Sequence, residues 1–288
     1  MPSFNLEYPT QPYSKVNRHN DRASYALETI HEIVNTCPIL HVSFADPGAA
    51  FPAVLPMIGQ MGSFERPSAD VGDVLDLYLH GHVGVRLASR ARADADGGGL
   101  PVCVAATHLD GLVLALTPFS SSYNYRSAVL FGRAVVVADP AEQRYALELI
   151  TDSVVPGRYR GTTRSAPAPA ADPADAVATP AEIRATAVLR VRITAGSAKG
   201  RAGPPADTRA DLADLALRRG TWAGVVPVRY ELAAPVPAPY NQAPAVPAYL
   251  DEYRAEFNRA AAEGAAAAAR EGEGWAYGKG AGQEEEEE

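Results

Sequence analysis

The sequence predicts a mainly β protein, an antiparallel barrel with helices packed on its outside. The predicted element order is a helix, five or six strands, a second helix, a loop, a strand, a turn and a last strand. Strands and helices do not alternate strictly along this order, as they do in parallel doubly wound sheets. A closed antiparallel sheet flanked by helices fits the order better.

The apolar residues that could form a core set the size of this fold. The chain has 288 residues, of which 47% are hydrophobic, but many of these are Ala residues late in the chain. Ala buries little surface, so the core must come from larger side chains. We therefore expect an N-terminal arm at 1–20 and one domain at 21–235, with a flexible insert at 165–181. A Pro-rich segment, an Ala-rich helix and an acidic tail are expected at 236–288.

Hydrophobic periodicity predicts the elements of the first hundred or so residues. Apolar residues spaced as on one helix face predict a helix at 21–36, which Asp21 or Ser24 could cap. Alternating and β-branched stretches predict strands. The other elements predicted here are strands at 39–44, 52–58 and 76–82, a short helix at 83–92 and a turn at 94–99.

Turn and breaker residues guide the prediction in the rest of the chain. Asp110-Gly111 predicts a hairpin between strands at 101–108 and 112–117. Gly132 lies inside a predicted strand at 128–138, where it indicates a bulge or the close approach of another backbone. The elements predicted after it are a helix at 140–153 with Pro140 in its first turn, strands at 187–194 and 224–232, and a helix at 248–271.

Charge and composition exclude several classes of function. The formal net charge is −8, and without the terminal run of five Glu it is near −3, so no basic face for nucleic acid is predicted. The N-terminus has no apolar signal-peptide region, and the longest apolar runs are too short to span a membrane. Cys37 and Cys103 are expected to be free thiols, and no Cys/His cluster predicts a metal site. A cytoplasmic protein without membrane contact is expected.

The most specific local pattern is His80-Gly81-His82, since common catalytic signatures such as GxSxG, HExxH and the P-loop are absent. On a strand this spacing puts both imidazoles on one face, which would suit a metal chelate, but no third ligand is evident nearby. The alternative is a ligand-facing strand end, where Gly81 lets a flat group or a phosphate approach. Arg86, just after Gly84, could then meet an anion.

A second polar pattern precedes the predicted strand at 128–138. Residues 123–127 (YNYRS) offer hydroxyl, amide and guanidinium groups within five positions. They are interpreted either as a polar loop with aromatic packing or as part of a binding site.

The order of several segments resembles a known family. The segments are FPAVLPMIG (51–59), LYLHGHVGVRLA (77–88), VCVAATHLDGLVLA (102–115), SSYNYRSAVLFGRA (121–134), SAKGRAGPP (197–205) and TWAGVVPV (221–228). Their order and spacing are similar to those of FMN-binding split-barrel proteins of the pyridoxamine 5′-phosphate oxidase-related group. Within it, the chain resembles the flavin-nucleotide-binding or nitroimidazole-resistance-like subgroup, over about residues 15–232.

This resemblance implies a six-stranded antiparallel split β-barrel that forms a homodimer, with FMN bound at the interface and touched by both chains. It also implies the cofactor-binding residues. These are Val54, Leu55 and Pro56; His80, Gly81 and His82; Arg86; Asn124, Arg126 and Ser127; and Lys199, Arg201 and Trp222. Trp222 could instead be a core aromatic, and Lys199 and Arg201 could be solvated.

The expected function is that of an FMN-dependent oxidoreductase acting on a small molecule, with His80 or His82 as a proton donor. The basic cluster that a vitamin B6 phosphate pocket uses is not evident in residues 221–232, so vitamin B6 oxidation is not predicted. Two alternatives stay open. One is a flavin carrier without turnover. The other is a haem-binding relative, whose axial ligand would be His41, His80, His82 or His108.

Overall fold

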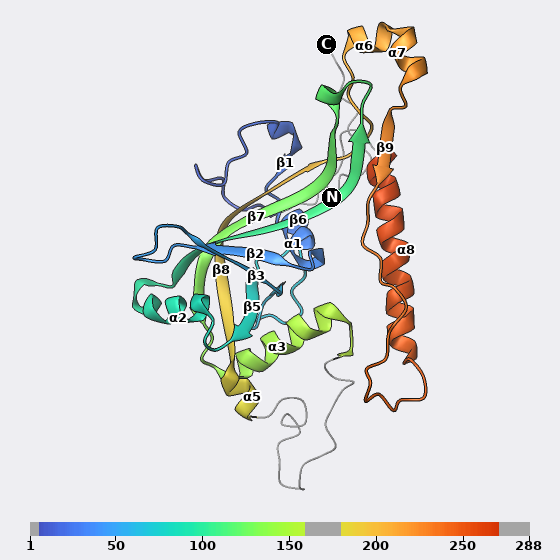
Figure 1. Ribbon diagram of the computed structural model, residues 1–288. Coiled ribbons are helices and arrows are strands. Elements are labelled where there is room, and N and C mark those ends of the chain that lie inside the picture. The colour runs from blue at the N-terminus through green and yellow to red at the C-terminus, as the bar shows by residue number, and fades with distance from the viewer. Residues whose placement is uncertain (1–5, 159–179, 271–288) are drawn as a thin grey trace, which may run out of the picture. The chain divides into compact units, whose positions relative to one another are not determined.

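The fold is described from a computed structural model that covers residues 6–158 and 180–270 (Figure 1). The chain separates into two compact units. The first unit comprises Met1–His108, Ser127–Ala198 and Ala233–Glu256, and the second comprises Leu109–Arg126, Lys199–Leu232 and Phe257–Glu288. The domain boundaries predicted from the sequence stay predictions, and most of the predicted insert lies outside the described residues.

Antiparallel strands make up the frame of the fold. The strands are β1 (Ala23–Ser24), β2 (Leu40–Phe44), β3 (Ala53–Met57), β4 (Gly59–Gly62), β5 (Asp76–His82), β6 (Leu100–Leu114), β7 (Ser122–Val136), β8 (Thr186–Arg201) and β9 (Gly224–Pro227). Their order is β3-β2-β6-β7-β8-β5-β4, with β1 paired to β8 and β9 paired to β6. The pairs β2–β3, β2–β6, β4–β5, β5–β8 and β6–β9 are antiparallel.

One stretch of chain reaches both ends of this strand order. Only Ile58 separates β3 from β4, yet β3 pairs with β2 at one end of the order and β4 pairs with β5 at the other. Joining the two edges in this way leaves few backbone groups unpaired, as in a barrel. The mainly antiparallel sheet with flanking helices is confirmed, whereas the count of six strands and the dimer stay predictions.

Helices flank the sheet. The α-helices are α1 (Leu27–Thr36), α2 (Arg86–Ala93), α3 (Pro140–Val154), α5 (Pro180–Ala185), α6 (Arg209–Ala213), α7 (Leu215–Gly220) and α8 (Ala248–Arg270). Short 3-10 turns occupy Asn20–Arg22, Ala95–Gly97 and Pro118–Ser120. In the first unit, α1 packs against β4, and α3 packs against β4 and β5. The N-terminus of α3 is capped by Asp139, whose carboxylate accepts the Ala141 N–H, and Pro140 stands in its first turn as predicted.

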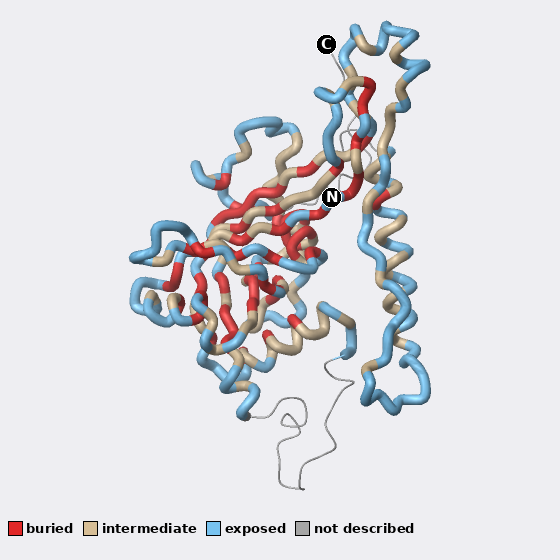
Figure 2. Tube along the Cα trace, in the orientation of Figure 1, coloured by how far each residue is buried: buried red, intermediate tan, exposed pale blue. Residues whose placement is uncertain are grey.

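The core of the first unit lies between these helices and the sheet (Figure 2). The apolar face of α1 is buried, and so are alternate residues of β2 and several residues of β5. At β5, Tyr78 packs with Ala146 and Ile150 of α3 and with Val188 of β8. Burying these large apolar groups supplies the main stabilisation of the unit.

The second unit is built on the extension of β6 and β7. Residues Gly111–Leu114 of β6 pair with β9, and α6 and α7 begin at capping residues Thr208 and Asp214. Asp207 accepts the backbone N–H of Leu116 at 2.8 Å. These hydrogen bonds give partners to backbone N–H groups at the ends of the short helices and strands, which would otherwise have none.

The predicted hairpin at Asp110-Gly111 is wrong. β6 runs without a turn from Leu100 to Leu114. Asp110 is buried in this strand, and its carboxylate binds the Arg126 guanidinium. The Asp-Gly pattern is a local turn signal, and a distant charge partner overrides it here.

Two other predictions have different outcomes. The first helix begins at Leu27 rather than at residue 21, and its N-cap is Ala26, without a side-chain cap from Asp21 or Ser24. The close approach predicted at Gly132 is confirmed, because a Cβ there would meet the Arg192 carbonyl well inside van der Waals contact. Among the described helices, none combines the length and apolarity that a membrane crossing requires.

Candidate functional site

One group of predicted site residues lies on an open face of the first unit. Val54 on β3 pairs with Ser43 on β2, and Pro56 pairs with His41, so these four side chains share one side of the sheet. Val54 is 57% exposed, which is unusual for a β-branched residue in a strand. Leu55 pairs with the buried Val42 instead, so it faces the interior.

The same face continues onto β6, where Ala105 pairs with His41 and Cys103 pairs with Ser43. We call the side chains of His41, Ser43, Val54, Pro56, Cys103 and Ala105 the outer face. Cys103 and Cys37 are both free thiols, as expected. The outer face is exposed and partly apolar, with a hydroxyl and an imidazole on one strand, which suits an apolar ring with a polar edge.

A second group gathers where β5 ends and α2 begins. His82 Nδ1 accepts the Gly84 N–H at 3.1 Å, so in the neutral ring the proton lies on Nε2. Burial lowers the pKa of His80, which keeps its imidazole neutral near pH 7. Among residues 6–158 and 180–270, no group hydrogen-bonds the buried Nδ1 of His80. A Cβ on Gly81 would lie 3.7 Å from Met57 of β3, so this junction adjoins the β3 strand.

Arginine side chains of α2 converge on one carboxylate beside this junction. Arg86 Nη1 lies 3.4 Å from Asp46 Oδ2, and Arg90 Nε lies 3.6 Å from Asp46 Oδ1. Asp46 lies just after β2 in the chain, and the Arg86 side chain is 59% exposed. Arg90 Nη2 also lies 3.9 Å from Asp94 Oδ2, so two carboxylates balance the two cations, and the exposed Arg86 guanidinium offers N–H donors at the surface. Such a cluster suits a phosphate group.

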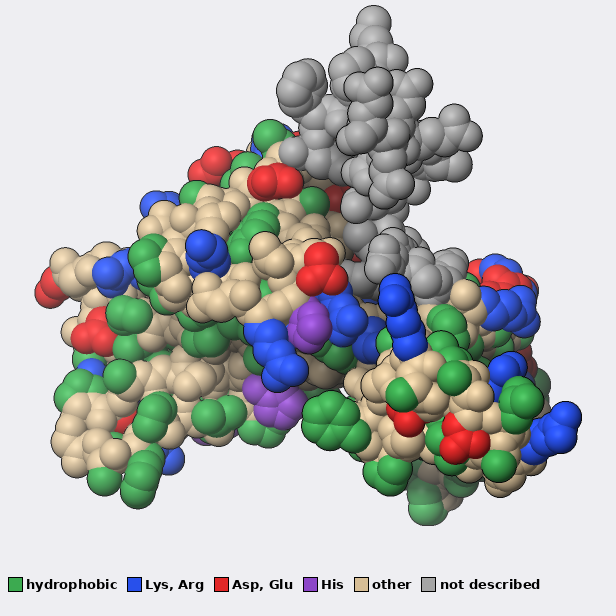
Figure 3. Space-filling view, turned by 90° about the horizontal axis from the view of Figure 1, so that it is seen from above, with side chains coloured by type: hydrophobic (Ala, Val, Ile, Leu, Met, Phe, Trp, Pro, Cys, Tyr) green, Lys and Arg blue, Asp and Glu red, His purple; other side chains and the backbone are tan. Residues whose placement is uncertain are grey.

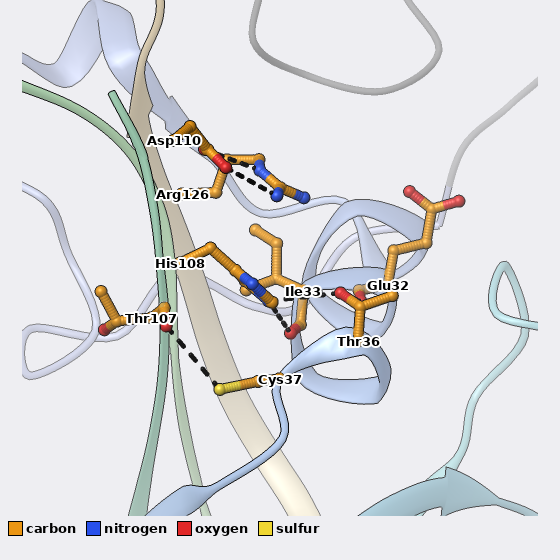
Figure 4. Close-up of polar contacts among 8 residues, drawn as sticks. All are labelled: Glu32, Ile33, Thr36, Cys37, Thr107, His108, Asp110 and Arg126. Atoms are coloured by element: carbon orange, nitrogen blue, oxygen red, sulfur yellow. Dashed lines mark hydrogen bonds and ion pairs between the residues drawn. The ribbon is translucent and has the colours of Figure 1, made fainter. Parts of the chain in front are cut away.

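His108 connects β6 to α1 inside the first unit (Figure 4). Its Nε2 lies 3.1 Å from the Ile33 carbonyl and 3.2 Å from the Thr36 hydroxyl. Cys37 Sγ donates more weakly to the Thr107 carbonyl, at 3.8 Å. Because its Nε2 is already bonded in a buried setting, His108 is a structural residue in this arrangement.

In the second unit, Arg126 and Asp110 form a bidentate ion pair. Arg126 Nε and Nη2 each donate to one Asp110 oxygen at 2.9 Å, as Figure 4 shows. The Asp110 side chain is nearly buried, so the pair is shielded from solvent. The guanidinium predicted to bind a cofactor is therefore used within the protein.

Asn124 organises the rest of the second unit. It is fully buried, and its amide donates to the Gly203 and Ala268 carbonyls at 3.1 and 2.9 Å. Its Oδ1 accepts a hydrogen bond from Arg201, which also donates to the Pro204 carbonyl at 2.8 Å. Both amide donors are directed to the segment at 203–204 and to the end of α8.

The family can now be assigned by comparison. The sequence profile of the family described as pyridoxamine 5′-phosphate oxidase matches residues 27–200, more than half of the chain. The chain belongs to this family. It is a family of flavin-binding split-barrel proteins, in agreement with the resemblance of the motif order.

Two solved structures are similar over most of the chain. The flavocytochrome Anf3 from Azotobacter vinelandii is 30% identical, with a TM-score of 0.65, over 86% of this chain and 99% of that one. The FAD and haem binding protein from Mycobacterium smegmatis is also 30% identical, with a TM-score of 0.61, over 81% of this chain and 97% of that one. The comparison with curated proteins found no match.

Within this member of the pyridoxamine 5′-phosphate oxidase family, the predicted site residues fall into two sets. The first unit holds Val54, Leu55, Pro56, His80, Gly81, His82, Arg86 and Ser127, and the second holds Asn124, Arg126, Lys199, Arg201 and Trp222. In the first set, β3 and the β5–α2 junction are brought together. In the second, Asn124 and Arg201 are brought together by their hydrogen bond. The cofactor-binding role of every one of these residues stays a prediction.

Trp222 was interpreted as a possible core aromatic and Lys199 as a possible solvated side chain. The structure shows neither arrangement. Trp222 is 66% exposed, with its ring against the backbone of Gly224, so it is not a core aromatic. Lys199 is half-buried and engaged by a neighbour rather than fully solvated.

The sequence reasoning missed Arg90 and Asp46. Arg90 stands four residues after Arg86, which places both side chains on one helix face, and this spacing was available from the sequence. Asp46 could not be connected to them, because the loop after β2 meets α2 only through the fold. Within the described residues, no group of three or more His, Cys, Asp and Glu side chains could hold a metal ion.

Proposed function

We propose that this protein is a redox protein that binds a flavin nucleotide and haem. The observation that carries the proposal is the 30% identity, over 86% and 81% of this chain, with a flavocytochrome and with a protein that binds FAD and haem. Membership of a flavin-binding family supports the flavin independently. Haem was an alternative from the sequence, and these two relatives raise it to part of the main proposal.

The residues of the first unit fit a flavin nucleotide. Arg86 and Arg90 supply guanidinium groups for the phosphate, with Asp46 holding both in position. The outer face supplies an apolar wall through Val54 and Pro56. His82 presents its Nε2–H as a donor for a polar ring edge, because its Nδ1 is already an acceptor.

The flavin is proposed to be FAD. The resemblance of the motif order implied FMN, and the phosphate next to the flavin is common to both nucleotides. The Mycobacterium smegmatis relative is an FAD and haem binding protein, and the match covers 97% of its chain. This relative favours the larger nucleotide, FAD. FMN and FAD would both place this phosphate against Arg86. The identity of the flavin that is released from the protein therefore decides between the two nucleotides.

His80 is the side chain that best fits an axial ligand of haem iron. A metal-binding imidazole must be neutral, and burial keeps His80 neutral. His31 and His108 already use ring nitrogens in buried hydrogen bonds, whereas no described residue hydrogen-bonds Nδ1 of His80. Figure 3 shows histidine side chains at the surface of the molecule.

When bound, a flavin exchanges hydride or electrons with a small molecule, and haem iron exchanges single electrons. The chain's own residues bind and orient the groups, and His82 can deliver a proton from Nε2. We propose an oxidoreductase with a small-molecule substrate. A carrier without turnover is the alternative, and flavin that is lost on simple dialysis would favour it.

A homodimer is part of the same proposal. Val54 and Pro56 leave an apolar stripe uncovered in the single chain, and a second copy or the bound ring system would cover it. Sedimentation of the purified protein should give twice the chain mass. A monomer that retains flavin and haem would remove the dimer from the proposal.

Paired variants test the cofactor assignments. His80→Ala should lose the haem absorbance and keep the flavin, while His19→Asn, at an exposed histidine of the first unit, should keep both. Arg86→Ala should weaken flavin binding about tenfold or more, because it removes a charge-assisted phosphate contact. Arg219→Ala, an exposed arginine of the second unit, is the matched control. Full haem content in His80→Ala, or unchanged flavin affinity in Arg86→Ala, would overturn the corresponding assignment.

A further inference from the structure

A cavity in the first unit is lined by none of the candidate cofactor-binding residues. Its volume is about 280 Å³, and it is lined by Ser63, Phe64, Glu65, Arg66, Val74, Leu75, Asp76, Tyr78, Arg190 and Arg192. Asp76 and Tyr78 lie on the same face of β5 as His80, toward the opposite end of the strand. The volume is at the small end for ligand sites, so the cavity would take a small molecule.

The charges in this cavity are unevenly paired. Arg190 Nη1 binds Glu142 Oε1 at 2.9 Å, and the same oxygen accepts the Tyr78 hydroxyl at 2.9 Å. The remaining carboxylate near Arg190 is Asp76, but its Oδ2 is 3.8 Å from Nε, too far for a hydrogen bond. The buried Nε–H of Arg190 consequently has no acceptor in the part of the chain that the structure describes. A buried donor without an acceptor is costly, and a ligand oxygen would remove this cost.

Arg192 adds a second available cation at the same cavity. It is exposed, and no described residue pairs with it by a hydrogen bond or an ion pair. Arg66, by contrast, is held by the Val74 carbonyl and by Asp73. Burial raises the pKa of the Asp76 carboxyl, Arg190 and Arg192 lower it in part, and the nearby Glu142 and Glu65 raise it.

The rest of the lining is mixed, with the hydroxyl of Ser63, the carboxylate of Glu65 and the apolar side chains of Phe64, Val74 and Leu75. Phe64 packs against Tyr145 with a ring separation of 5.8 Å, which fixes one wall of the cavity. Val74 and Leu75 provide aliphatic surface, and Val74 is 63% exposed at the rim. The cavity therefore combines guanidinium donors of Arg190 and Arg192 with a short apolar wall, and the carboxylates of Glu65 and Asp76 also line it.

We propose that this cavity is a binding site for a small organic carboxylate with a short apolar or aromatic body. The carboxylate oxygens accept from Arg192 and from the Nε–H of Arg190, and the body of the ligand lies against Phe64 and Val74. Arginine donors in this arrangement are the usual partners of carboxylates in proteins. The proposal does not depend on the flavin and haem assignment, since none of its residues belongs to those sites.

Fluorobenzoate and its neutral amide, fluorobenzamide, are suitable probes, with binding followed by fluorine NMR on the full chain. Fluorobenzoate should bind in a saturable manner, and fluorobenzamide should bind at least tenfold more weakly. Arg192→Gln should weaken fluorobenzoate binding about tenfold, and the exposed Arg219→Gln should leave it unchanged. Val74→Trp, which fills the rim without removing a charge, should also weaken it.

Arg190 is not used as a test, because removing it from the buried network could unfold the protein. Arg192 and Val74 are exposed, so their variants should keep the wild-type thermal unfolding temperature and flavin content. No saturable binding of fluorobenzoate, equal binding of the amide, or full affinity in Arg192→Gln would each overturn the proposal. A variant that loses fluorobenzoate binding but keeps its flavin content would support the proposal. It would also show that this site is independent of the cofactor assignment.

Discussion

The Tyr8 hydroxyl lies 2.6 Å from Nε2 of His31, and both side chains are buried. His31 Nδ1 lies 2.8 Å from the Val71 carbonyl, which can only accept a hydrogen bond. Nδ1 therefore carries the proton and Nε2 accepts from Tyr8. This chain of hydrogen bonds ties the N-terminal arm to α1 and to the segment before β5.

Stability should fall as the pH is lowered because of this buried imidazole. Burial lowers the pKa of His31 from 6.5 to about 4, so between these values the unfolded chain takes up a proton that the folded chain does not. Stability from this group is fully present above the unfolded value and decreases as the pH falls from 6.5 toward 4, by up to about 1.4 kcal/mol per pH unit.

Urea unfolding at pH 7 and pH 5 in wild type and in His31→Gln measures this effect. The variant should be less stable at pH 7, because it loses the bond network, but its stability should change less between the two pH values. A pH dependence as steep as that of the wild type would show that His31 does not titrate as described.

Gly132 should not tolerate a side chain. A Cβ there would collide with the Arg192 carbonyl of the neighbouring strand β8, and a backbone carbonyl cannot move aside without disturbing the strand pairing. We expect Gly132→Ala to destabilise the protein by about 1–3 kcal/mol. Gly97→Ala is the control, since a Cβ at that position would have no described atom within 4 Å and the φ of Gly97 is not positive. Equal thermal unfolding temperatures for the two variants would contradict this account of Gly132.

Asn124 should be essential to the second unit for structural reasons. Asn124→Leu removes two donors and one acceptor from a buried position, leaving the Gly203 and Ala268 carbonyls and Arg201 without this partner. The expected loss is about 2–4 kcal/mol, from several unsatisfied polar groups. Asn241→Leu, in an exposed loop, should be nearly neutral.

Hydrogen exchange distinguishes this explanation from a general loss of stability. In Asn124→Leu the amide of Gly203, which donates to Ala268, should exchange faster than the amides of β5. Unchanged protection at Gly203 would mean that Asn124 does not hold this segment in place.

The local signals in the sequence predicted the elements that depend on local chemistry. The strand at Asp76–His82 has the bounds that its alternating residues predicted, although Leu77, Tyr78 and Leu79 are all buried, so both sides of its middle are covered. The helix at Pro140–Val154 follows from its proline and its Asp139 cap. The Asp110-Gly111 turn failed because its carboxylate binds Arg126, 16 residues further along the chain, and no local pattern encodes that partner.

The candidate site also contains residues that a local motif predicted and contacts that only the fold creates. Arg86 and His82 were identified from a motif, since both lie within a few residues of Gly84. The pairing of Arg86 with Asp46 depends on the loop after β2, and the use of Asn124 depends on the end of α8, so neither could be derived from spacing. The carboxylate cavity was missed for the same reason, because Arg190 and Asp76 meet only through the pairing of β5 with β8.

The central claim is that one chain binds both a flavin and haem. The absorption spectrum of the purified protein, followed by identification of the cofactors released on denaturation, tests it most directly. The account predicts a Soret band together with oxidised-flavin absorbance, and FAD as the released flavin. FMN as the released flavin would correct the nucleotide alone. A protein that shows neither chromophore, and takes up neither added flavin nor added haem, would contradict the claim.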